Sequence, residues 1–334
     1  METPRISVLL PCFNDGAWLD DAVGSVLDQT YRRHEILIVD DGSTDPATVE
    51  TLKRWTLPGS RVLRTANRGL PAARNHAAAH ATGDFFCALD ADDRLAPTWF
   101  EKAIGVLDAD PDCAFVSHWL EAFGDERWTW KPERCDLPAL LARNTVNGAA
   151  LVRRSAFEAV GGYEETMREG CEDWDFWLRL VERGFRGTIL PEVLFHYRRR
   201  AGSMSRMMTD AARYRLPLET LVSRHEAAYR QHLVAVMLAA ESEALDLRSE
   251  LGSLVRDEMT VLQPQLDRAR EELTAAREKV DRLRPTVEAL RDRERFAVEA
   301  RELRREVAAL RSSWSWRLTA PIRKAWGWFL RFQR

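Results

Sequence analysis

The sequence predicts an α/β protein with a mainly parallel sheet flanked by helices, followed by an α-helical, partly coiled-coil carboxyl-terminal region. In the first half of the 334 residues, short apolar runs alternate with segments of helical periodicity, and the runs end in polar loops. This alternation is typical of strand–helix–strand units in a parallel sheet. From Leu266 onward, apolar residues recur at alternating steps of three and four among many Glu and Arg residues, which is coiled-coil spacing.

The first half supports the sheet element by element. Residues 6–10 form a short β-branched run ending at Pro11, and residues 17–27 carry apolar side chains at helical spacing. A second apolar run at 35–39 is stopped by acidic, glycine and hydroxyl residues at 40–45, which favour a turn and a helix cap. Ligands of such sheets gather at the carboxyl ends of the strands. The same order continues with strands at 62–64 and 85–89 and a helix at 70–81.

Two acidic loops follow apolar strands and are expected on one rim of the sheet. One contains Asp40 and Asp41, and the other contains Asp90, Asp92 and Asp93. Aspartate commonly caps helices and turns, and a single loop of this kind would be interpreted that way. Carboxylates crowded this closely repel one another unless a cation or protonation relieves them. Their oxygens suit magnesium or manganese shared with a phosphate.

A third acidic pair, Glu172 and Asp173, precedes Trp174 and Trp177, which fall on one face of an expected helix. The helix dipole favours negative charge at this end, so capping alone would also explain the pair. Between the acidic groups, Arg74 lies near the start of another expected helix, where a guanidinium and a helix amino terminus could meet a phosphate. A solvated surface arginine is the alternative.

Five short motifs stand in order between roughly residues 5 and 205. They read SVLLPCFN at 7–14, VDDGSTD at 39–45, ARN at 73–75, LDADD at 89–93, and Glu172 with Asp173 followed by LRL at 178–180. Together they resemble family 2 glycosyltransferases with the GT-A fold, which is a Rossmann-like nucleotide-binding fold. The resemblance implies an enzyme that uses a nucleotide-sugar donor.

The resemblance also implies a donor site at the strand ends. Phe13 would contact the nucleobase with its ring, and Asp41 would accept a hydrogen bond from the base edge. Pro11 and Asp40 would shape the pocket, and Arg74 would approach the diphosphate. The implied nucleotide-binding residues are Pro11, Phe13, Asp40, Asp41, Arg74 and Asp90.

The segment from Asp90 to Asp92 resembles the DxD metal motif of the family. Asp92 is the expected ligand of a divalent ion, Mn²⁺ or Mg²⁺, that bridges the two phosphates. Asp90 would contact the ribose or a metal-bound water. His196 is a candidate third ligand, although an isolated histidine after an apolar strand is more often structural. For Asp93 we expect only a cap of the next helix.

By resemblance, Asp173 is the catalytic base that takes the proton of the acceptor hydroxyl, and Glu172 is the second choice. A carboxylate is a poor base toward a resting alcohol but becomes effective as the attacking oxygen grows acidic, contributing roughly 100- to 10,000-fold. The implied reaction is a single displacement with inversion at the anomeric carbon.

The last part of the resemblance supplies a candidate diphosphate lid and candidate acceptor contacts. Arg198, Arg199 and Ser203 belong to a basic segment that could close over the diphosphate, and a basic surface loop is the alternative. Glycine permits close approach of a sugar and indole rings suit stacking, although tryptophan more commonly packs in cores. The candidate acceptor residues are Trp119, Gly148 and Trp174, with Trp128 and Trp130 in the same irregular segment as Trp119.

The chain divides into four expected regions. Pro264 and Pro285 interrupt the coiled-coil pattern, and Pro285 is expected to kink the helix or begin a new one. We expect the coiled coil to make a homo-oligomer, with folding back on residues 211–260 as the rival. The regions are a catalytic domain at 1–205, a helical extension at 206–264, a coiled-coil helix at 265–312 and a basic, Trp-rich segment at 313–334.

Residues 313–334 combine tryptophan, phenylalanine and cations without any acidic residue. These are the components of a helix that lies on an anionic membrane surface, and docking to a partner protein is the alternative. Five scattered cysteines favour a reduced compartment. The sequence offers neither a secretory signal nor a membrane-spanning run. We therefore expect a cytoplasmic protein held peripherally at the inner face of the cytoplasmic membrane.

The expected function is transfer of a sugar to a glycan or lipid-linked glycan acceptor in cell-surface polysaccharide biosynthesis. A non-catalytic GT-A-fold scaffold that assembles other glycosyltransferases through the coiled coil is the main alternative. A sugar-nucleotide pyrophosphorylase would need a glycine-rich phosphate loop with basic residues near the amino terminus, and residues 7–16 do not supply one. A net charge of -3 gives no reason to expect nucleic acid as a partner.

Overall fold

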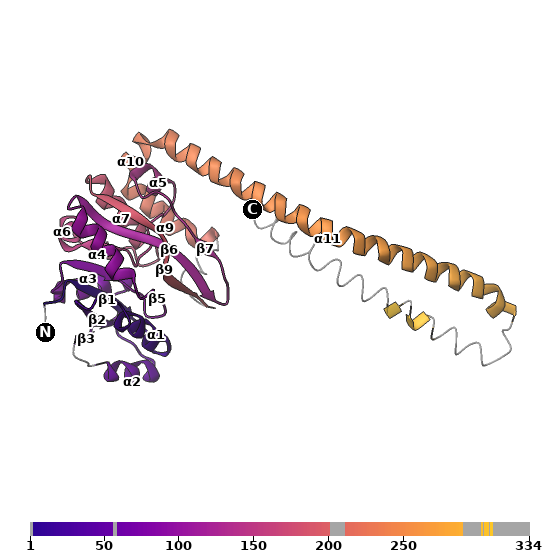
Figure 1. Cartoon of the computed structure of the whole chain (residues 1–334), viewed down its shortest axis with the longest axis horizontal. Helices are drawn as coiled ribbons and strands as arrows, with labels where there is room; N and C mark the ends of the chain where they lie inside the picture. The colour runs from indigo at the N-terminus through magenta and orange to yellow at the C-terminus, as the bar shows by residue number, and fades with distance from the viewer. Residues whose placement is uncertain are drawn as a thin grey trace. The chain divides into compact units, whose positions relative to one another are not determined.

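The computed structural model describes residues 3–55, 59–200 and 211–289, together with residues 302, 304–306 and 308–309. The chain forms two compact units, Met1–Ala240 and Glu241–Arg334. The first unit holds the sheet and the helices that cover it (Figure 1). The expected boundary at residue 205 falls outside the described residues.

The described strands of the first unit form one nine-stranded sheet. Its order is β3-β2-β1-β4-β8-β6-β9-β5, and β7 pairs with β6. The strands are β1 (Ile6–Cys12), β2 (His34–Asp40), β3 (Ser60–Arg64), β4 (Phe85–Ala88), β5 (Arg94–Leu95), β6 (Cys113–Gly124), β7 (Thr129–Trp130), β8 (Leu151–Arg153) and β9 (Arg186–Arg199).

The sheet is parallel in one half and mixed in the other. Strands β3, β2, β1 and β4 run parallel, as the sequence predicts. Strand β8 is antiparallel to both β4 and β6, β9 is parallel to β6, and β5 is antiparallel to β9. The expectation of a mainly parallel sheet therefore holds only for the first half, because the pairing of the three-residue strand β8 depends on distant partners rather than on local periodicity.

Helices cover both faces of the sheet, so strands β1, β2 and β4 of the parallel half are buried on both sides, whereas the edge strand β3 is partly exposed. In β1, Val8 and Leu10 join the core under α1, α2 and α4, whereas Leu9 joins the core under the other helices. The helices of the first face are α1 (Gly16–Leu27), α2 (Pro46–Arg54) and α4 (Trp99–Ala109). Those of the second face are α3 (Leu70–His80), α5 (Leu137–Ala142), α6 (Arg154–Ala159), α7 (Glu172–Glu182) and α9 (Ala211–Arg224).

The parallel strands end together, which fixes where the polar loops emerge. Strands β1 and β2 end in register, with Cys12 opposite Asp40, and β4 runs parallel beside β1. The loops that carry Phe13, Asp41 and Asp90 therefore leave the sheet at one edge, as the sequence predicts.

Helix α7 starts from an unusual backbone. Gly170 and Cys171 have φ angles of 118° and 62°, and a non-glycine residue in the left-handed region costs of order 1–3 kcal/mol. This turn places Glu172 and Asp173 in the first turn of α7. The sharp entry thus delivers two acidic side chains to one helix end.

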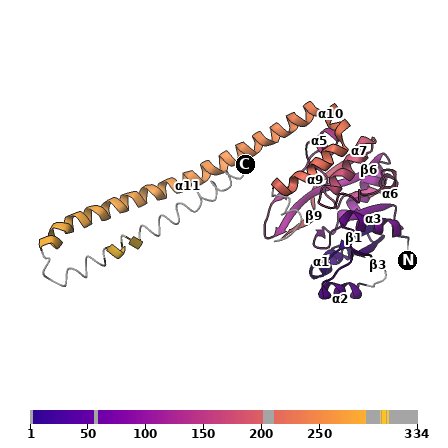
Figure 2. The same cartoon turned by 180° about the vertical axis from the view of Figure 1, so that it is seen from behind.

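Between residues 211 and 289 the helices are α9, α10 (Glu226–Gln231) and α11 (Leu233–Ala289). Helix α11 has 57 residues and is drawn as a continuous helix in Figure 2, and at 1.5 Å per residue it is roughly 85 Å long. It runs through both Pro264 and Pro285, so Pro285 does not begin a new helix, and a kink at Pro285 stays a prediction. No helix in the described part of the chain is long and apolar enough to span a bilayer.

Candidate active site

A cavity of about 980 Å³ opens at the carboxyl edge of the parallel strands. Loops after β1, β2 and β4 line it, together with the end of β9 and the segment that leads into α7. The cavity therefore brings together the acidic residues that the sequence analysis placed in three separate parts of the chain: after β2, after β4 and at the start of α7. Its sequence-predicted lining residues are Pro11, Phe13, Asp41, Arg74, Asp90, Asp92, Gly148, Glu172, Asp173 and Arg198.

One end of the cavity combines an exposed aromatic ring with a buried carboxylate. Phe13 is 44% exposed, and Pro11 lies beside it in the lining. Asp41 accepts hydrogen bonds from the backbone N–H groups of Arg68 and Gly69 at 2.9 and 2.8 Å, and from the hydroxyl of Thr65 at 3.1 Å. A carboxylate offers about four lone-pair sites, so one acceptor direction of Asp41 remains for a ligand.

Asp40 lies behind this end of the cavity rather than in its lining. Its carboxylate accepts from the backbone N–H of Ser43 at 2.8 Å and pairs with Arg64 at 3.2 Å. Asn14, which the sequence analysis did not assign, has a φ of 57° and accepts from the backbone N–H groups of Thr44 and Asp45. Asparagine is among the few residues that tolerate this backbone conformation, so its place after a strand is a usable signal.

Arg74 joins the two acidic walls of the cavity. Its buried guanidinium donates to Glu172 at 2.7 Å and to Asp90 at 2.8 Å, and it lies 5.3 Å from the ring centroid of Tyr163. Burial opposes the charge, but the carboxylates of Asp90 and Glu172 raise the pKa of Arg74 above its ordinary value. Both terminal nitrogens of Arg74 are therefore already engaged by carboxylates.

Two aspartates of the loop after β4 are bound by residues at the end of β9 and by Arg200, which follows β9. Arg200 pairs with Asp92 at 2.8 Å and with Asp15 at 2.6 Å. Burial raises the pKa of Asp92, and the nearby charge of Asp90 raises it further. Asp93 is buried and accepts from the backbone N–H of Arg198 at 2.7 Å. Asp93 does not cap the next helix, which begins at Trp99 after Thr98.

The carboxylates of Asp90 and Asp92 suit a hard divalent cation, but two carboxylates supply only some of the ligands that such a cation needs. Both carboxylates line the cavity, and their crowding is the kind that a cation relieves. In the residues that the structure describes, no three His, Cys, Asp or Glu side chains are grouped to hold a metal ion. His196 is not in the cavity lining, and its Nδ1 lies 3.9 Å from Glu121. Further ligands would have to come from a bound phosphate or from water.

Glu172 and Asp173 form the opposite wall of the cavity. Burial raises the pKa of both carboxyls, while the charge of Arg74 opposes the rise. Asp173 accepts from Asn144 at 3.2 Å and from the backbone N–H of Trp174 at 2.7 Å. Within the described ranges Asp173 makes no direct ion pair, whereas Glu172 is held by Arg74. Asp173 is thus the freer acceptor of the two.

The predicted lid arginines have other partners. Arg198 is buried between the rings of Trp18 and Phe123, at 4.2 and 4.4 Å, and pairs with Asp21 at 2.6 Å. Arg199 pairs with Glu126 at 3.2 Å and is not in the cavity lining. Ser203 lies outside the described residues. Arg198 Nε does donate to the backbone carbonyl of Asp92 at 2.7 Å, but the arginine that pairs with a carboxylate of the loop after β4 is the next one, Arg200.

The acceptor candidates separate into two groups. Gly148 lines the cavity. Trp119 and Trp174 do not, because their indole N–H groups donate to the carbonyls of Pro132 and Leu140 within the fold, at 3.1 and 2.6 Å. The indoles that line the cavity are those of Trp128 and Trp130. Of the residues that sequence reasoning did not assign, the lining also includes Asn14, Asp15, Arg168 and Arg200.

The fold is an α/β fold of the GT-A class, and comparisons with known proteins specify the family of the chain. The model of glycosyl transferase family 2 matches residues 7–164, and that of glycosyltransferase-like family 2 matches residues 135–246. The putative glycosyltransferase EpsE of Bacillus subtilis (strain 168) is 30% identical over 213 residues, which cover 61% of this chain and 76% of EpsE. The chain belongs to glycosyltransferase family 2.

Two further relatives extend the comparison. The putative teichuronic acid biosynthesis glycosyltransferase TuaG of Bacillus subtilis (strain 168) is 29% identical over 218 residues, covering 63% of this chain and 85% of TuaG. The structure of Staphylococcus aureus TarS 1-349 in complex with UDP-GlcNAc superposes with a TM-score of 0.53 at 20% identity and covers 60% of each chain. At this identity TarS supports the fold alone. The match spans less than two thirds of that TarS chain.

Proposed function

We propose that this protein transfers a sugar from a nucleotide-sugar donor to a hydroxyl group of a glycan or lipid-linked glycan, with inversion, in the synthesis of a cell-surface polysaccharide. The observation that carries the proposal is a single cavity lined by the ring of Phe13, the carboxylates of Asp90 and Asp92, and Asp173. TuaG, a putative teichuronic acid biosynthesis glycosyltransferase, and the TarS complex with UDP-GlcNAc support this substrate class.

In this proposal the donor nucleobase stacks on Phe13, and Asp41 accepts from the base edge through its remaining lone pair. The hydrogen bonds from Arg68 and Gly69 hold that carboxylate still. A preorganised acceptor loses little entropy on binding. The exposed ring of Phe13 and the fixed carboxylate of Asp41 would then read the face and the edge of one base.

Asp92, with Asp90 close by, would hold a divalent cation, Mn²⁺ or Mg²⁺, together with the diphosphate. Such a cation stabilises the charge that develops on a nucleoside diphosphate leaving group. Arg200 already places one positive charge on Asp92. On donor binding, this guanidinium is close enough to the acidic loop to change partner from carboxylate to phosphate.

Asp173 is the proposed general base. Burial raises its pKa toward the working pH, which improves a carboxylate as a base. Glu172 is a weaker choice because Arg74 holds its carboxylate at 2.7 Å. A base that faces the sugar from the side opposite the leaving diphosphate supports a single displacement, which inverts the anomeric carbon.

Donor binding tests this proposal directly. Calorimetric titration with common nucleotide sugars, in Mn²⁺ or Mg²⁺, should identify at least one that binds. Phe13→Ala should then lose roughly 1–3 kcal/mol of binding free energy, the usual contribution of base stacking. Leu27→Ala is the matched control, because Leu27 is 41% exposed but lies outside the cavity lining. Failure of every donor to bind would overturn the proposal and favour the scaffold alternative.

The carboxyl-terminal regions are proposed to serve assembly and membrane attachment. In α11, the side chains of Leu266, Leu273 and Val280, which repeat at coiled-coil spacing, are only partly buried, which supports a partner for the helix, here a second copy of the chain. Residues 313–334 lie outside the described residues and are proposed, from their composition, to bind the anionic inner face of the cytoplasmic membrane.

Two deletions separate these roles. Loss of residues 313–334 should release the protein from anionic vesicles without changing its mass in solution or its activity on a soluble acceptor. Loss of the chain from residue 265 onward should also reduce the oligomer. Sedimentation with and without vesicles measures both. Vesicle binding that survives the shorter deletion, or an oligomer that survives the longer one, would contradict the corresponding role.

A further inference from the structure

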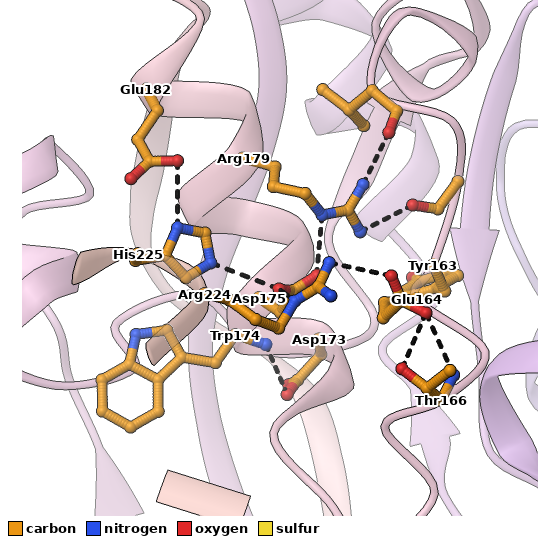
Figure 3. Close-up of polar contacts among 12 residues, drawn as sticks. Tyr163, Glu164, Thr166, Asp173, Trp174, Asp175, Arg179, Glu182, Arg224 and His225 are labelled. Carbon is orange, nitrogen blue, oxygen red and sulfur yellow. Dashed lines mark hydrogen bonds and ion pairs between the residues drawn. The ribbon is translucent and has the colours of Figure 1, made fainter. Parts of the chain in front are cut away.

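A buried group of charges lies under the first turns of α7, outside the cavity lining. We call it the Asp175 cluster (Figure 3). Its members come from α7, from the segment between α6 and α7, and from the end of α9. They are Glu164, Asp175, Arg179, Glu182, Arg224 and His225.

Asp175 is the centre of the cluster. Its side chain is fully buried, and both of its oxygens are bound. Oδ2 accepts from Arg179 Nε at 2.7 Å, and Oδ1 accepts from Arg224 Nε at 2.7 Å and from His225 Nε2 at 3.2 Å. Removing a partner from a buried charge is strongly destabilising, because the remaining charge is left uncompensated.

The partners of Asp175 connect it to the rest of the unit. Arg179 also donates to the carbonyls of Val160 and Gly162 at 2.6 and 2.7 Å. Arg224 reaches Glu164 at 2.8 Å, which fixes the segment before α7. His225 pairs with Glu182 at 2.9 Å, near the end of α7. Helix α7 is therefore held along its length by residues that follow it in sequence by about 40.

Asp175 lies in the first turn of α7, the same turn that carries Glu172 and Asp173. The backbone N–H of Asp175 donates to the carbonyl of Cys171 at 2.9 Å, closing the first turn of α7. Cys171 holds the left-handed conformation that starts the helix, and such a conformation persists only when its surroundings enforce it. Glu172 and Asp173 lie between these two anchored residues. Their placement therefore depends on how firmly Asp175 is held.

We propose that Arg224 and His225 are positioning residues for the transfer reaction: by binding Asp175 they hold the first turn of α7, and with it Asp173, against the cavity. Neither residue lines the cavity, so they act through Asp175 and not on the substrates. Helices α9 and α10 are then part of the catalytic unit. Their inclusion in the compact unit Met1–Ala240 agrees with this role.

Turnover of full-length variants tests the proposal, which here rests on the proposed transferase function. Arg224→Met should lower kcat by about 10- to 100-fold, the cost of a small misplacement of a catalytic group, with little change in KM for the donor. Arg224→Lys should recover part of kcat, because one ammonium can reach Asp175 but not Glu164 as well. If Arg224→Met does not fold, His225→Gln gives the same comparison with a smaller change.

The matched control is Arg5→Met. Arg5 makes a bidentate pair with Asp108, at 2.9 and 2.7 Å, away from the cavity lining. Loss of this pair should lower the melting temperature while leaving kcat within twofold of the wild type. Equal losses of kcat in the two variants at equal stability would mean that Arg224 has only a structural role and would overturn the proposal.

Thiol labelling provides a test that does not need activity. Cys171 is the half-buried cysteine, whereas Cys12, Cys87, Cys113 and Cys135 are buried. Burial and the neighbouring carboxylates raise the pKa of Cys171 to about 12, so the native protein should react slowly with a thiol reagent. Release of the first turn in Arg224→Met should accelerate labelling several-fold, and the gain should vanish when Cys171→Ser is added.

The two experiments fail in different ways. A wild-type protein without transferase activity would overturn the proposed function, yet the labelling rates would still report on the first turn of α7. An unchanged labelling rate in Arg224→Met, with activity intact in the wild type, would overturn the positioning role of Arg224 and leave the transferase assignment in place.

Discussion

The cavity has two acidic walls that use cations differently. On one wall, after β4, Arg200 binds Asp92 directly from a side chain that is 29% exposed. On the other, at the start of α7, Asp173 faces the cavity with hydrogen bonds from Asn144 and from its own helix. Near each wall one further carboxylate is held by the fold: Asp93 beside the first, and Asp175, which lies outside the cavity lining, behind the second.

This difference separates two kinds of chemistry. A carboxylate that pairs with an accessible cation can exchange that cation for another and so suits the binding of charge. A carboxylate that makes no direct ion pair and has a raised pKa is free to accept a proton. Burial raises the pKa of both Asp92 and Asp173, but Asp92 pairs directly with an accessible cation, so Asp92 fits the first description and Asp173 the second.

Asp173→Asn is expected to have the largest effect, because it removes the proposed base and keeps the shape of the site. The kcat value should fall by roughly 100- to 10,000-fold. Donor affinity should stay within about threefold of the wild type, since Asp173 lies on the wall away from Asp92. Initial rates and calorimetry on the same preparation measure both. Transfer at near the wild-type rate would show that another group is the base and would break the comparison.

Asp92→Asn should instead act on donor binding. An amide is a weaker ligand for a hard cation, so addition of Mn²⁺ or Mg²⁺ should no longer strengthen donor binding, and affinity in the presence of metal should fall by about tenfold or more. The measurement is calorimetry with and without a chelator. Asp112→Asn, an exposed aspartate outside the cavity lining, is the control. If the variant keeps its full metal response, Asp92 is not the ligand.

On the wall after β4, the sequence predicted the carboxylates but not the arginine that pairs with Asp92. Asp90 and Asp92 follow a strand in the parallel half of the sheet, so local periodicity was enough to place them at the correct edge. Arg200 meets Asp15, a residue 185 positions earlier. No local pattern reports such a contact, and three consecutive arginines gave no means of choosing Arg200 over Arg198 or Arg199.

The second half of the fold was less predictable for the same reason. Strands β6, β8 and β9 pair across long stretches of chain, and the irregular segment between β6 and β8 hides which tryptophans turn inward. Trp174 lies on the apolar face of α7 and donates to the carbonyl of Leu140 within the core. Its helical spacing indicated packing as well as sugar contact, and only the tertiary structure decides between them.

The smallest effect that we expect is a pH dependence of stability, which comes from His225 in the Asp175 cluster. Burial lowers the pKa of His225, but Asp175 and Glu182 more than offset this, so its pKa is raised above the ordinary value. A raised pKa in the folded state means that the charged form stabilises the fold. That stabilisation is fully present below the unfolded pKa of about 6.5 and is lost as the pH rises through the folded value.

His225→Gln should remove this dependence. Loss of one partner from a buried hydrogen-bonded group costs roughly 1–3 kcal/mol, so the melting temperature of the variant should lie several degrees below that of the wild type at pH 5.5. The gap should narrow as the pH rises toward 9, because the wild type then loses the charge that the variant lacks. Arg5→Met, whose ion pair has no group that titrates in this range, should show a constant gap. A gap for His225→Gln that is equally constant would mean that His225 is not charged in the fold, and that Arg224 and Arg179 alone neutralise Asp175.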